Sequence, residues 1–235
     1  MLSIVVPTLN EEKYLPRLLD SIKKQEFRDY EIVVSDADSE DKTRQIAKKY
    51  GCRIVKGGFH ARGVNNGIKA AKGDIVLVLD ADAVLPDSFL TDNYNTFREK
   101  NLDLGSCLIK SVGGNLFDKI AHVFANAYYF SFEKIKPFVP SFCFFVRKKF
   151  FFNVGSFDEK IPWLVDLAFS NSLPKKTRYS LLPVHVKLSV RMAERLGRFR
   201  QARIMFLGAV LRTIGKNYYG RYEWKGKAKT LQRVV

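Results

Sequence analysis

The chain has 235 residues, 46% of them hydrophobic and 27% charged, which is enough for one folded domain with an appendage. A formal net charge of +16 and a pI near 9.8 favour anionic partners such as nucleotides, nucleic acid or an anionic membrane surface. Three widely spaced cysteines fit neither a zinc site nor a disulfide framework. No apolar run approaches the roughly 20 residues that cross a bilayer. Met1 runs directly into a strand pattern, so we expect no signal peptide.

The first half of the chain alternates between strand and helix patterns. Apolar runs predict strands at residues 2–6, 30–35, 53–55 and 75–79. Helical spacing predicts helices at 11–24, at 39–50 with Ser39 as a cap, and at 65–71. This alternation predicts an α/β fold with a doubly wound, mostly parallel sheet. Ligands of such sheets bind beyond the carboxyl ends of the strands, which selects residues 7–11, 36–41 and 80–82.

The second half is less regular. Phe117, Ile120, Phe124, Tyr128 and Phe132 follow helical spacing within residues 117–135. We expect this stripe to close a core, because aromatic helical spacing usually reflects packing; the alternative is a bilayer interface.

Residues 187–214 predict one or two basic helices, broken near Gly197. Arg191, Arg195 and Arg198 would share a helix face and meet membrane phosphates or an anionic acceptor. From residue 186 onward the chain carries 13 Lys or Arg and two acids, so most of the net charge lies there. We therefore divide the chain into a domain at 1–185, with halves at 1–100 and 101–185, and a basic helical extension at 186–235. The tail after Asn217 is polar, and we expect it to be loosely held.

Two carboxylates follow the most apolar strand. Asp80 and Asp82 are one residue apart at its carboxyl end, and Mg²⁺ or Mn²⁺ favours a few carboxylates together with substrate phosphate oxygens. A metal there would bridge a diphosphate and offset charge on the leaving group. The alternative is a solvated loop with two acids.

Two further segments at the same sheet edge are polar. Asp36 follows the second strand and can accept hydrogen bonds from a base or ribose, while Ser39 suits the helix cap. Residues Pro7, Thr8, Asn10 and Glu11 form a turn after the first strand, with side chains able to face a ligand. In the Gly-rich stretch 57–63, Arg62 is the candidate for a diphosphate contact, although the stretch matches neither a P-loop nor a dinucleotide fingerprint.

Together these motifs resemble family 2 of the inverting glycosyltransferases, which have the GT-A type fold. The matching stretches lie at residues 3–11, 31–43, 65–74 and 79–86, and Gly155-Ser156-Phe157-Asp158-Glu159 is similar to the family's GGFDE. The resemblance covers roughly residues 2–170. It implies a pocket for a nucleotide-diphosphate sugar at Pro7, Thr8, Glu11 and Asp36, with metal and diphosphate at Asp80 and Asp82. It also implies inversion by one in-line attack of the acceptor.

One position departs from the family. Many members have Glu-Asp shortly after GGFDE, and that Asp deprotonates the acceptor hydroxyl. Here Trp163-Leu164 stands at the corresponding place, so Asp166 from a shifted position, or Asp158, is the candidate base. A phosphate acceptor needs no base, because it is largely ionised near neutral pH. The acceptor would then be a polyprenyl phosphate or another membrane-linked molecule, and the enzyme cytoplasmic, at the inner face of the cell membrane.

Three other functions compete with this interpretation. The high pI would suit a nucleic-acid-binding protein, but no such motif occurs and the Asp pair would repel phosphate without a metal, so no nucleic acid is expected. A nucleotidyltransferase typically needs a Gly-rich loop after the first strand, which is lacking here. The missing Glu-Asp also fits an inactive relative that only binds nucleotide sugar.

Overall fold

The computed structural model describes the chain except for residues 136, 162–163, 215 and 217–235. The expected loose tail after Asn217, and Trp163, therefore lie outside the described residues. The strands are Leu2–Thr8 (β1), Tyr30–Asp36 (β2), Arg53–Lys56 (β3), Ile75–Leu79 (β4), Ala83–Val84 (β5), Leu104–Val112 (β6), Cys143–Arg147 (β7) and Tyr179–Ser189 (β8). The helices are Leu15–Lys23 (α1), Thr43–Lys49 (α2), His60–Ala70 (α3), Phe89–Glu99 (α4), Leu116–Phe132 (α5), Lys148–Asn153 (α6), Val165–Ser172 (α7), Arg191–Leu196 (α8) and Arg198–Thr213 (α9).

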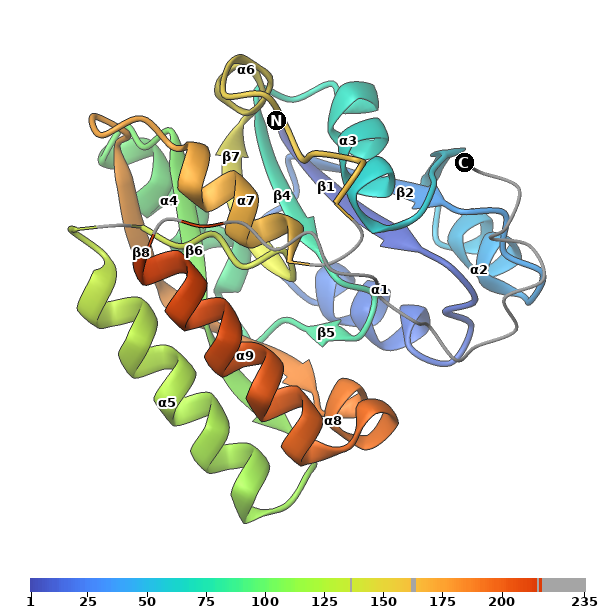
Figure 1. Cartoon of the computed structure of the whole chain (residues 1–235). Helices are drawn as coiled ribbons and strands as arrows, with labels where there is room; N and C mark the ends of the chain where they lie inside the picture. The colour runs from blue at the N-terminus through green and yellow to red at the C-terminus, as the bar shows by residue number, and fades with distance from the viewer. Residues whose placement is uncertain (136, 162–163, 215, 217–235) are drawn as a thin grey trace.

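These strands form one sheet in the order β3-β2-β1-β4-β7-β6-β8-β5 (Figure 1). Strands β1 to β4 are mutually parallel, and β6 is parallel to β8, while β7 lies antiparallel between β4 and β6. The expected α/β fold with a doubly wound, mostly parallel sheet is confirmed. Because the first four strands are parallel, the ends of β1, β2 and β4 lie at the same edge of the sheet.

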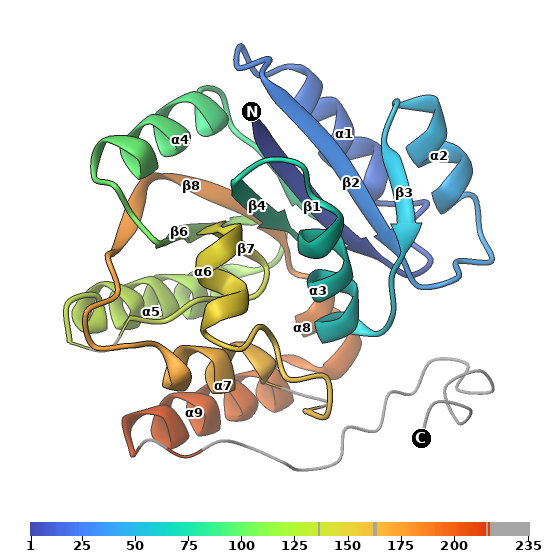
Figure 2. The same cartoon turned by 90° about the horizontal axis from the view of Figure 1, so that it is seen from above.

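Helices cover both faces of the sheet (Figure 2). Alternating side chains of the strands build a core on each face. Leu77 and Leu79 of β4 join the core beneath α1, α2 and α4, while Val76 and Val78 join the core beneath α3, α6 and α7. Both faces of β4 are therefore buried. This explains why its sequence is a continuous apolar run rather than an alternating one.

Three predicted helices begin elsewhere. The helix expected at 11–24 begins at Leu15. The helix expected at 39–50 begins at Thr43, and Ser39 does not cap it, because the Ser39 amide and hydroxyl both donate to Asp36. The helix expected at 65–71 begins earlier, at His60. Its close packing explains Gly63, where an added Cβ would lie 2.9 Å from the Gly58 carbonyl oxygen and 3.2 Å from the Pro7 Cβ.

The C-terminal half corrects two expectations and confirms a third. The aromatic stripe of α5 does not close a core, because Phe117, Ile120 and Phe124 are exposed and Ala125 and Tyr129 pack inward instead. The basic segment breaks at Gly197 as expected, where φ is 85°. This break leaves Arg191 and Arg195 on α8 and places Arg198 on α9, so the expected face of three arginines is not formed.

Strand β8 also crosses the expected domain boundary at residues 185 and 186. It continues to Ser189 and pairs with β6 on both sides of that point. We infer that the helical extension begins after Ser189. Among the described residues, no helix is both long enough and apolar enough to cross a membrane.

Candidate functional site

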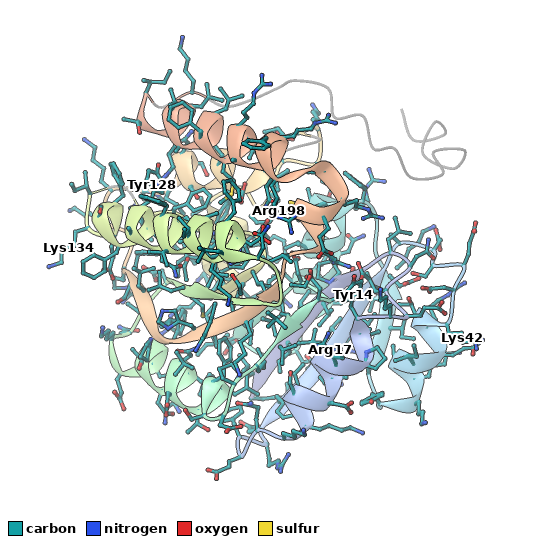
Figure 3. The ribbon with its side chains drawn as sticks, turned by 90° about the horizontal axis from the view of Figure 1, so that it is seen from below. Tyr14, Arg17, Lys42, Tyr128, Lys134 and Arg198 are labelled. Carbon is teal, nitrogen blue, oxygen red and sulfur yellow. The ribbon has the colours of Figure 1, made fainter. Side chains whose placement is uncertain are left out.

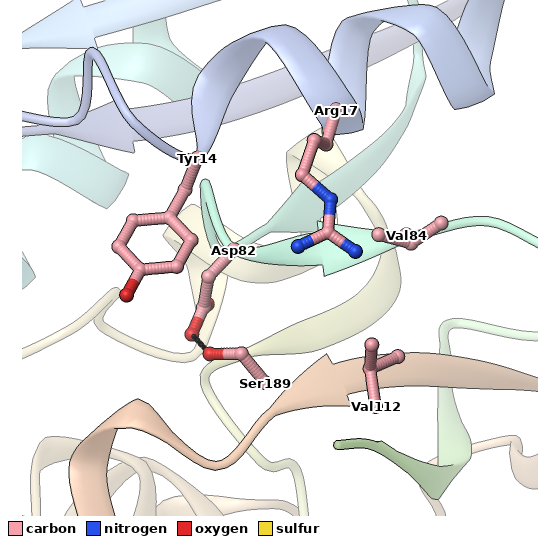
Figure 4. Close-up of a pocket in the computed structure, with 6 residues that line it drawn as sticks. All are labelled: Tyr14, Arg17, Asp82, Val84, Val112 and Ser189. Atoms are coloured by element: carbon pink, nitrogen blue, oxygen red, sulfur yellow. Dashed lines mark hydrogen bonds between the residues drawn. The ribbon is translucent and has the colours of Figure 1, made fainter. Parts of the chain in front are cut away.

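Strand pairing brings Asp82 to the C-terminal segment. The short strand β5 pairs antiparallel with β8 in a register that places Ala83 opposite Leu188. Asp82 therefore lies beside Ser189, whose hydroxyl donates a hydrogen bond to Asp82 Oδ2 (Figure 4). The two residues line a hollow together with Tyr14 and Arg17 of α1. Segments more than a hundred residues apart in sequence thus form one site.

Arg191 joins the carboxylates of two sheet-edge loops. Its guanidinium lies 2.6 Å from Glu11 Oε2 and 2.7 Å from Asp82 Oδ2. It also lies over the ring of Tyr14, 4.7 Å from the centroid. Arg191 is the first residue of α8, directly after β8, so the strand pairing that brings Ser189 here also brings Arg191. The arginine offsets negative charge at the position where the sequence predicts a cation.

Burial and crowding with other acids raise the pKa values of Asp80 and Glu11. The pKa of Asp80 rises to about 8 because the group is buried and lies near Asp82 and Glu11, although Arg191 opposes this. Burial also raises the pKa of Glu11. Three carboxyl groups compete for the positive charge of Arg191, and ionising all of them is unfavourable without a further cation.

These residues fit a hard divalent cation that also binds phosphate. Across the described ranges, no cluster of three His, Cys, Asp or Glu side chains could hold a metal by itself. Mg²⁺ and Mn²⁺, however, commonly use one or two carboxylates and take the remaining ligands from water and substrate phosphates. Asp80 and Asp82, one residue apart at the end of β4, supply such a pair.

Asp36 ties together the ends of β1 and β2. Its Oδ1 accepts hydrogen bonds from the Thr8 hydroxyl at 2.9 Å and the Ser39 hydroxyl at 2.6 Å, and its Oδ2 accepts from the Ser39 amide. Ser39 Oγ in turn accepts from the Asn10 amide at 2.9 Å. The structure thus brings Thr8, Asn10, Asp36 and Ser39 into one network, in which Thr8, Asp36 and Ser39 are buried and Asn10 is exposed. Pro7 lies next to it, at the packing contact with α3.

Arg62 and Asp158 lie farther from the carboxylates. Arg62 Nε is 2.8 Å from Glu159 Oε2, and Asn65 also donates to Glu159 at 3.1 Å. Asp158 is exposed, and its Oδ1 accepts from the amide of Lys160. Both Arg62 and Asp158 remain predictions as binding or catalytic groups.

Asp166 lies on the first turn of α7, facing the interior. Burial raises its pKa to about 6, while hydrogen bonds from backbone amides, including that of Leu167 at 2.9 Å, oppose the rise. Its charge makes a small contribution to the raised pKa of Asp80. A carboxyl group titrating near pH 6 suits proton transfer near neutral pH.

The sequence did not assign three residues that line or close the site. The sequence places Arg191 on a membrane-facing or acceptor-facing helix, and the segment from Ser189 resembles the tail of some microbial family members without a role for Ser189 itself. It gives no role to Arg17. Arg17 follows Tyr14 by three residues, which is the spacing of one helix face. The sequence alone therefore indicates that these two side chains lie on the same side of the first helix. The contact of Ser189 and Arg191 with Asp82 depends on the pairing of β5 with β8, which no local pattern indicates.

The family model of glycosyl transferase family 2 matches residues 3–155. The chain belongs to this family. The match spans β1 to α6 and contains Asp36, Asp80 and Asp82, whereas Arg191 and Asp166 lie beyond it.

Family 2 relatives are similar to parts of the chain. A poly(ribitol-phosphate) β-N-acetylglucosaminyltransferase, TarS of Staphylococcus aureus, is 34% identical over 48% of this chain and 21% of its own length. A dolichyl N-acetyl-α-D-glucosaminyl phosphate 3-β-D-2,3-diacetamido-2,3-dideoxy-β-D-glucuronosyltransferase of Methanococcus voltae is 30% identical over 52% of this chain and 43% of its own. The chain thus spans less than half the length of these relatives.

A solved structure confirms the GT-A type fold of this family 2 chain. A mannosyltransferase of Pyrobaculum calidifontis, in complex with GDP-Man and Mn²⁺, superimposes with a TM-score of 0.69. The match covers 93% of this chain and 65% of that one at 19% identity, a level that supports the fold alone.

Proposed function

We propose that the chain is an inverting glycosyltransferase that takes a sugar from a nucleotide-diphosphate donor and depends on Mg²⁺ or Mn²⁺. The observation that carries this proposal is the meeting of Glu11, Asp80 and Asp82 at the edge of the sheet, with the pKa of Asp80 raised to about 8. Solvated loop acids would not be buried together with one arginine between them. Family membership supports the class of reaction.

In this proposal each loop has a distinct task. The network of Thr8, Asn10, Asp36 and Ser39 shapes the nucleotide side of the pocket, with Pro7 and Glu11 beside it. Asp80 and Asp82 hold the cation, which when bound offsets charge on the departing diphosphate. Arg191 leaves Asp82 as the cation arrives and then faces the diphosphate, because its positive charge is attracted to the incoming phosphates. Arg62 is a second candidate for the diphosphate.

Asp166 is the proposed base for a hydroxyl acceptor. Its pKa of about 6 leaves it mainly ionised at neutral pH and able to accept a proton. Asp158 is the less favoured candidate, because it is exposed. A phosphate acceptor would need neither group. Replacing Asp166 by Asn separates the two cases, since it slows transfer to a hydroxyl and leaves transfer to a phosphate largely unchanged.

The acceptor that we propose is membrane-linked, which implies a cytoplasmic enzyme at the inner face of the membrane. The name of the Methanococcus relative describes a dolichyl-linked acceptor. A polyprenyl phosphate or a lipid-linked sugar would both fit this class. We expect no nucleic-acid partner, because the acids at the site repel phosphate in the absence of a metal.

One observation favours a second function, that of an inactive binder of nucleotide sugars. Arg191 already neutralises Glu11 and Asp82 without a metal, and a permanent ion pair of this kind would block the cation. An active enzyme must release Arg191 when donor and metal bind, whereas an inactive binder need not.

The test is a thermal-shift screen of nucleotide sugars with and without Mn²⁺, followed by an assay of donor hydrolysis and transfer. We expect one class of donor to raise the melting temperature only with Mn²⁺, because a ligand that binds the folded state stabilises it. Asp82→Asn should abolish both the shift and the turnover. Metal-independent binding without turnover would favour the inactive binder, and no binding of any donor would refute both functions.

A further inference from the structure

Most exposed large apolar side chains gather on one surface. Among the described residues, seventeen such side chains are exposed, and fourteen of them lie between residues 116 and 135 or between residues 192 and 214. The other three are Met1, Phe59 and Phe152. We call the outward faces of α5 and α9, with the adjoining Ile135 and Ile214, the α5–α9 surface. A soluble chain rarely exposes so many large apolar groups together, so this surface indicates a partner.

The outward face of α5 is apolar where a solvent-facing helix would be polar. Leu116, Ile120, Val123 and Phe130 are spaced by three, four or seven residues, so they share one face. Their exposed fractions are 71%, 45%, 67% and 69%, in that order. The opposite side of the helix carries Ala125 and Tyr129 into the core. The exposed apolar face is therefore additional to the face that holds α5 on the domain.

Helix α9 lies beside α5 and continues the surface (Figures 1 and 3). Arg198 pairs with Asp118 at 3.0 Å, and Arg212 donates to the Tyr128 hydroxyl at 3.1 Å, so these polar groups lie between the helices. On the outer side the rings of Phe117 and Phe199 are 6.0 Å apart. This ring contact joins the apolar faces of the two helices.

The charges on this surface are almost all positive. Helix α9 contains four arginines and no acid, and Arg200 and Arg203 are exposed among its outward apolar residues. Lys119 and Lys134 are exposed along α5 and just beyond its end, and Figure 3 shows Lys134 extending from that end.

The acids of α5 and its C-cap are turned inward. Asp118 pairs with Arg198, and Glu133 accepts the amide of Leu181 at 2.7 Å. Apolar residues flanked by exposed Lys and Arg match the boundary between acyl chains and anionic headgroups.

A hollow beside this surface shares one residue with the hollow at Asp82. It lies between α5, α8 and α9, and its walls include Phe117, His122, Met192 and Met205. Ser189, whose hydroxyl donates a hydrogen bond to Asp82, lines both hollows. An acceptor anchored in a bilayer against the α5–α9 surface would therefore have a short route to the site.

We propose that the α5–α9 surface docks on an anionic membrane and presents this hollow to lipid-anchored acceptors. The docking itself rests only on the exposed apolar and basic residues. The delivery of acceptors rests also on the proposed transferase function. The bilayer is favoured over a protein partner because the basic residues on the two helices, with their acids paired inward, match anionic headgroups.

The experiment is co-sedimentation of the full chain with vesicles of phosphatidylcholine, alone or mixed with phosphatidylglycerol. We expect binding to the mixed vesicles that weakens with salt, and little binding to phosphatidylcholine alone. Phe124→Asp with Phe206→Asp should abolish binding, because both side chains are more than 70% exposed on the surface. Phe152→Asp is the matched control, because Phe152 is exposed on α6.

A second pair of variants tests the charge. Arg200→Gln with Arg203→Gln should weaken binding about 30-fold, since each basic residue near an anionic surface contributes a factor of roughly five. Lys48→Gln with Lys49→Gln removes the same charge from α2 and should change binding little. The circular dichroism spectrum of each variant is the control for folding. A native spectrum means that a loss of binding is not a loss of structure.

Three results would overturn the proposal. These are no binding of the wild type to the mixed vesicles, equal binding by the Phe124 and Phe206 variant, and a solution dimer that the same variant converts to a monomer. Asp82→Asn separates this proposal from the proposed function: it should bind vesicles normally while losing donor turnover. The Phe124 and Phe206 variant should hydrolyse a soluble donor normally.

Discussion

Replacing Arg191 by Met removes the charge that holds the carboxylates together and keeps an apolar stem of similar length against Tyr14. In the wild type the guanidinium contacts Glu11 at 2.6 Å and Asp82 at 2.7 Å, and these carboxylate side chains are only 13% and 9% exposed. Without the arginine, Glu11 and Asp82 would lose the cation that pairs with both of them, although Arg195 and Arg17 lie nearby.

The expected cost follows from these contacts. Two charges about 4 Å apart attract by about 4 kcal/mol at an effective dielectric constant near 20. Removing one partner of a buried pair costs about 3–5 kcal/mol. Protonation of Asp80, whose pKa is about 8, offsets part of this cost. We therefore expect a loss of about 3 kcal/mol in the free energy of unfolding at pH 8, or about 6–12 °C in melting temperature.

The assay is a melting curve at pH 8, with and without Mn²⁺. The variant should melt lower than the wild type and should gain more from Mn²⁺, because the cation no longer competes with an arginine for Asp82. Arg17→Met is the control, since it removes a positive charge from the same hollow and should cost much less. An unchanged melting temperature together with an equal Mn²⁺ shift would refute the reasoning.

Three further predictions follow from other contacts. Asp166→Asn should raise the free energy of unfolding above pH 6 by up to about 3 kcal/mol. The reason is that a buried acid with a raised pKa of about 6 destabilises the fold as pH rises from about 4 through 6. Urea titrations at pH 4 and pH 8 check this, and equal gains in stability at both pH values would contradict it. Gly67→Ala should destabilise the fold by about 1–3 kcal/mol, because the new Cβ would lie 2.3 Å from Val5 Cγ1. In Gly208→Ala the nearest atom to the new Cβ is 3.6 Å away, so this variant should stabilise α9 slightly. A higher melting temperature for Gly67→Ala than for Gly208→Ala would show that α3 can shift. We also propose that Arg17, which lines the hollow beside Asp82, contacts an anionic acceptor. Arg17→Met should then raise KM for that acceptor about tenfold with kcat nearly unchanged, as one lost charge-assisted hydrogen bond implies. Steady-state kinetics check this, and the same change with a neutral acceptor would show that Arg17 acts only on the fold.

Much of the nucleotide-binding half could be predicted from the sequence. The strand at 75–79 is confirmed, because burial on both faces leaves an uninterrupted apolar run that local patterns detect. The starts of α2 and α3 were wrong by several residues. Ser39 has the chemistry of a cap, but Asp36 takes both of its hydrogen-bonding groups, and that competition depends on the pairing of β1 with β2.

The aromatic stripe of α5 shows a second limit. Spacing identifies the residues that share a helix face, but it does not say whether that face meets the core or the outside. Here small Ala125 and polar-tipped Tyr129 pack inward, while Phe124 and Phe130 are exposed. Likewise, no spacing indicates that Arg191 meets Glu11, 180 residues away. That contact exists because β8 returns to the edge of the sheet where β1 and β4 end.

The most direct test of the account is anomalous diffraction at the manganese edge from crystals grown with Mn²⁺ and a nucleoside diphosphate. The account predicts a peak about 2 Å from oxygens of Asp80 or Asp82 and of the diphosphate, with the Arg191 guanidinium moved off Asp82. Bound nucleotide with no peak at these carboxylates, and with Arg191 still on Asp82, would contradict it.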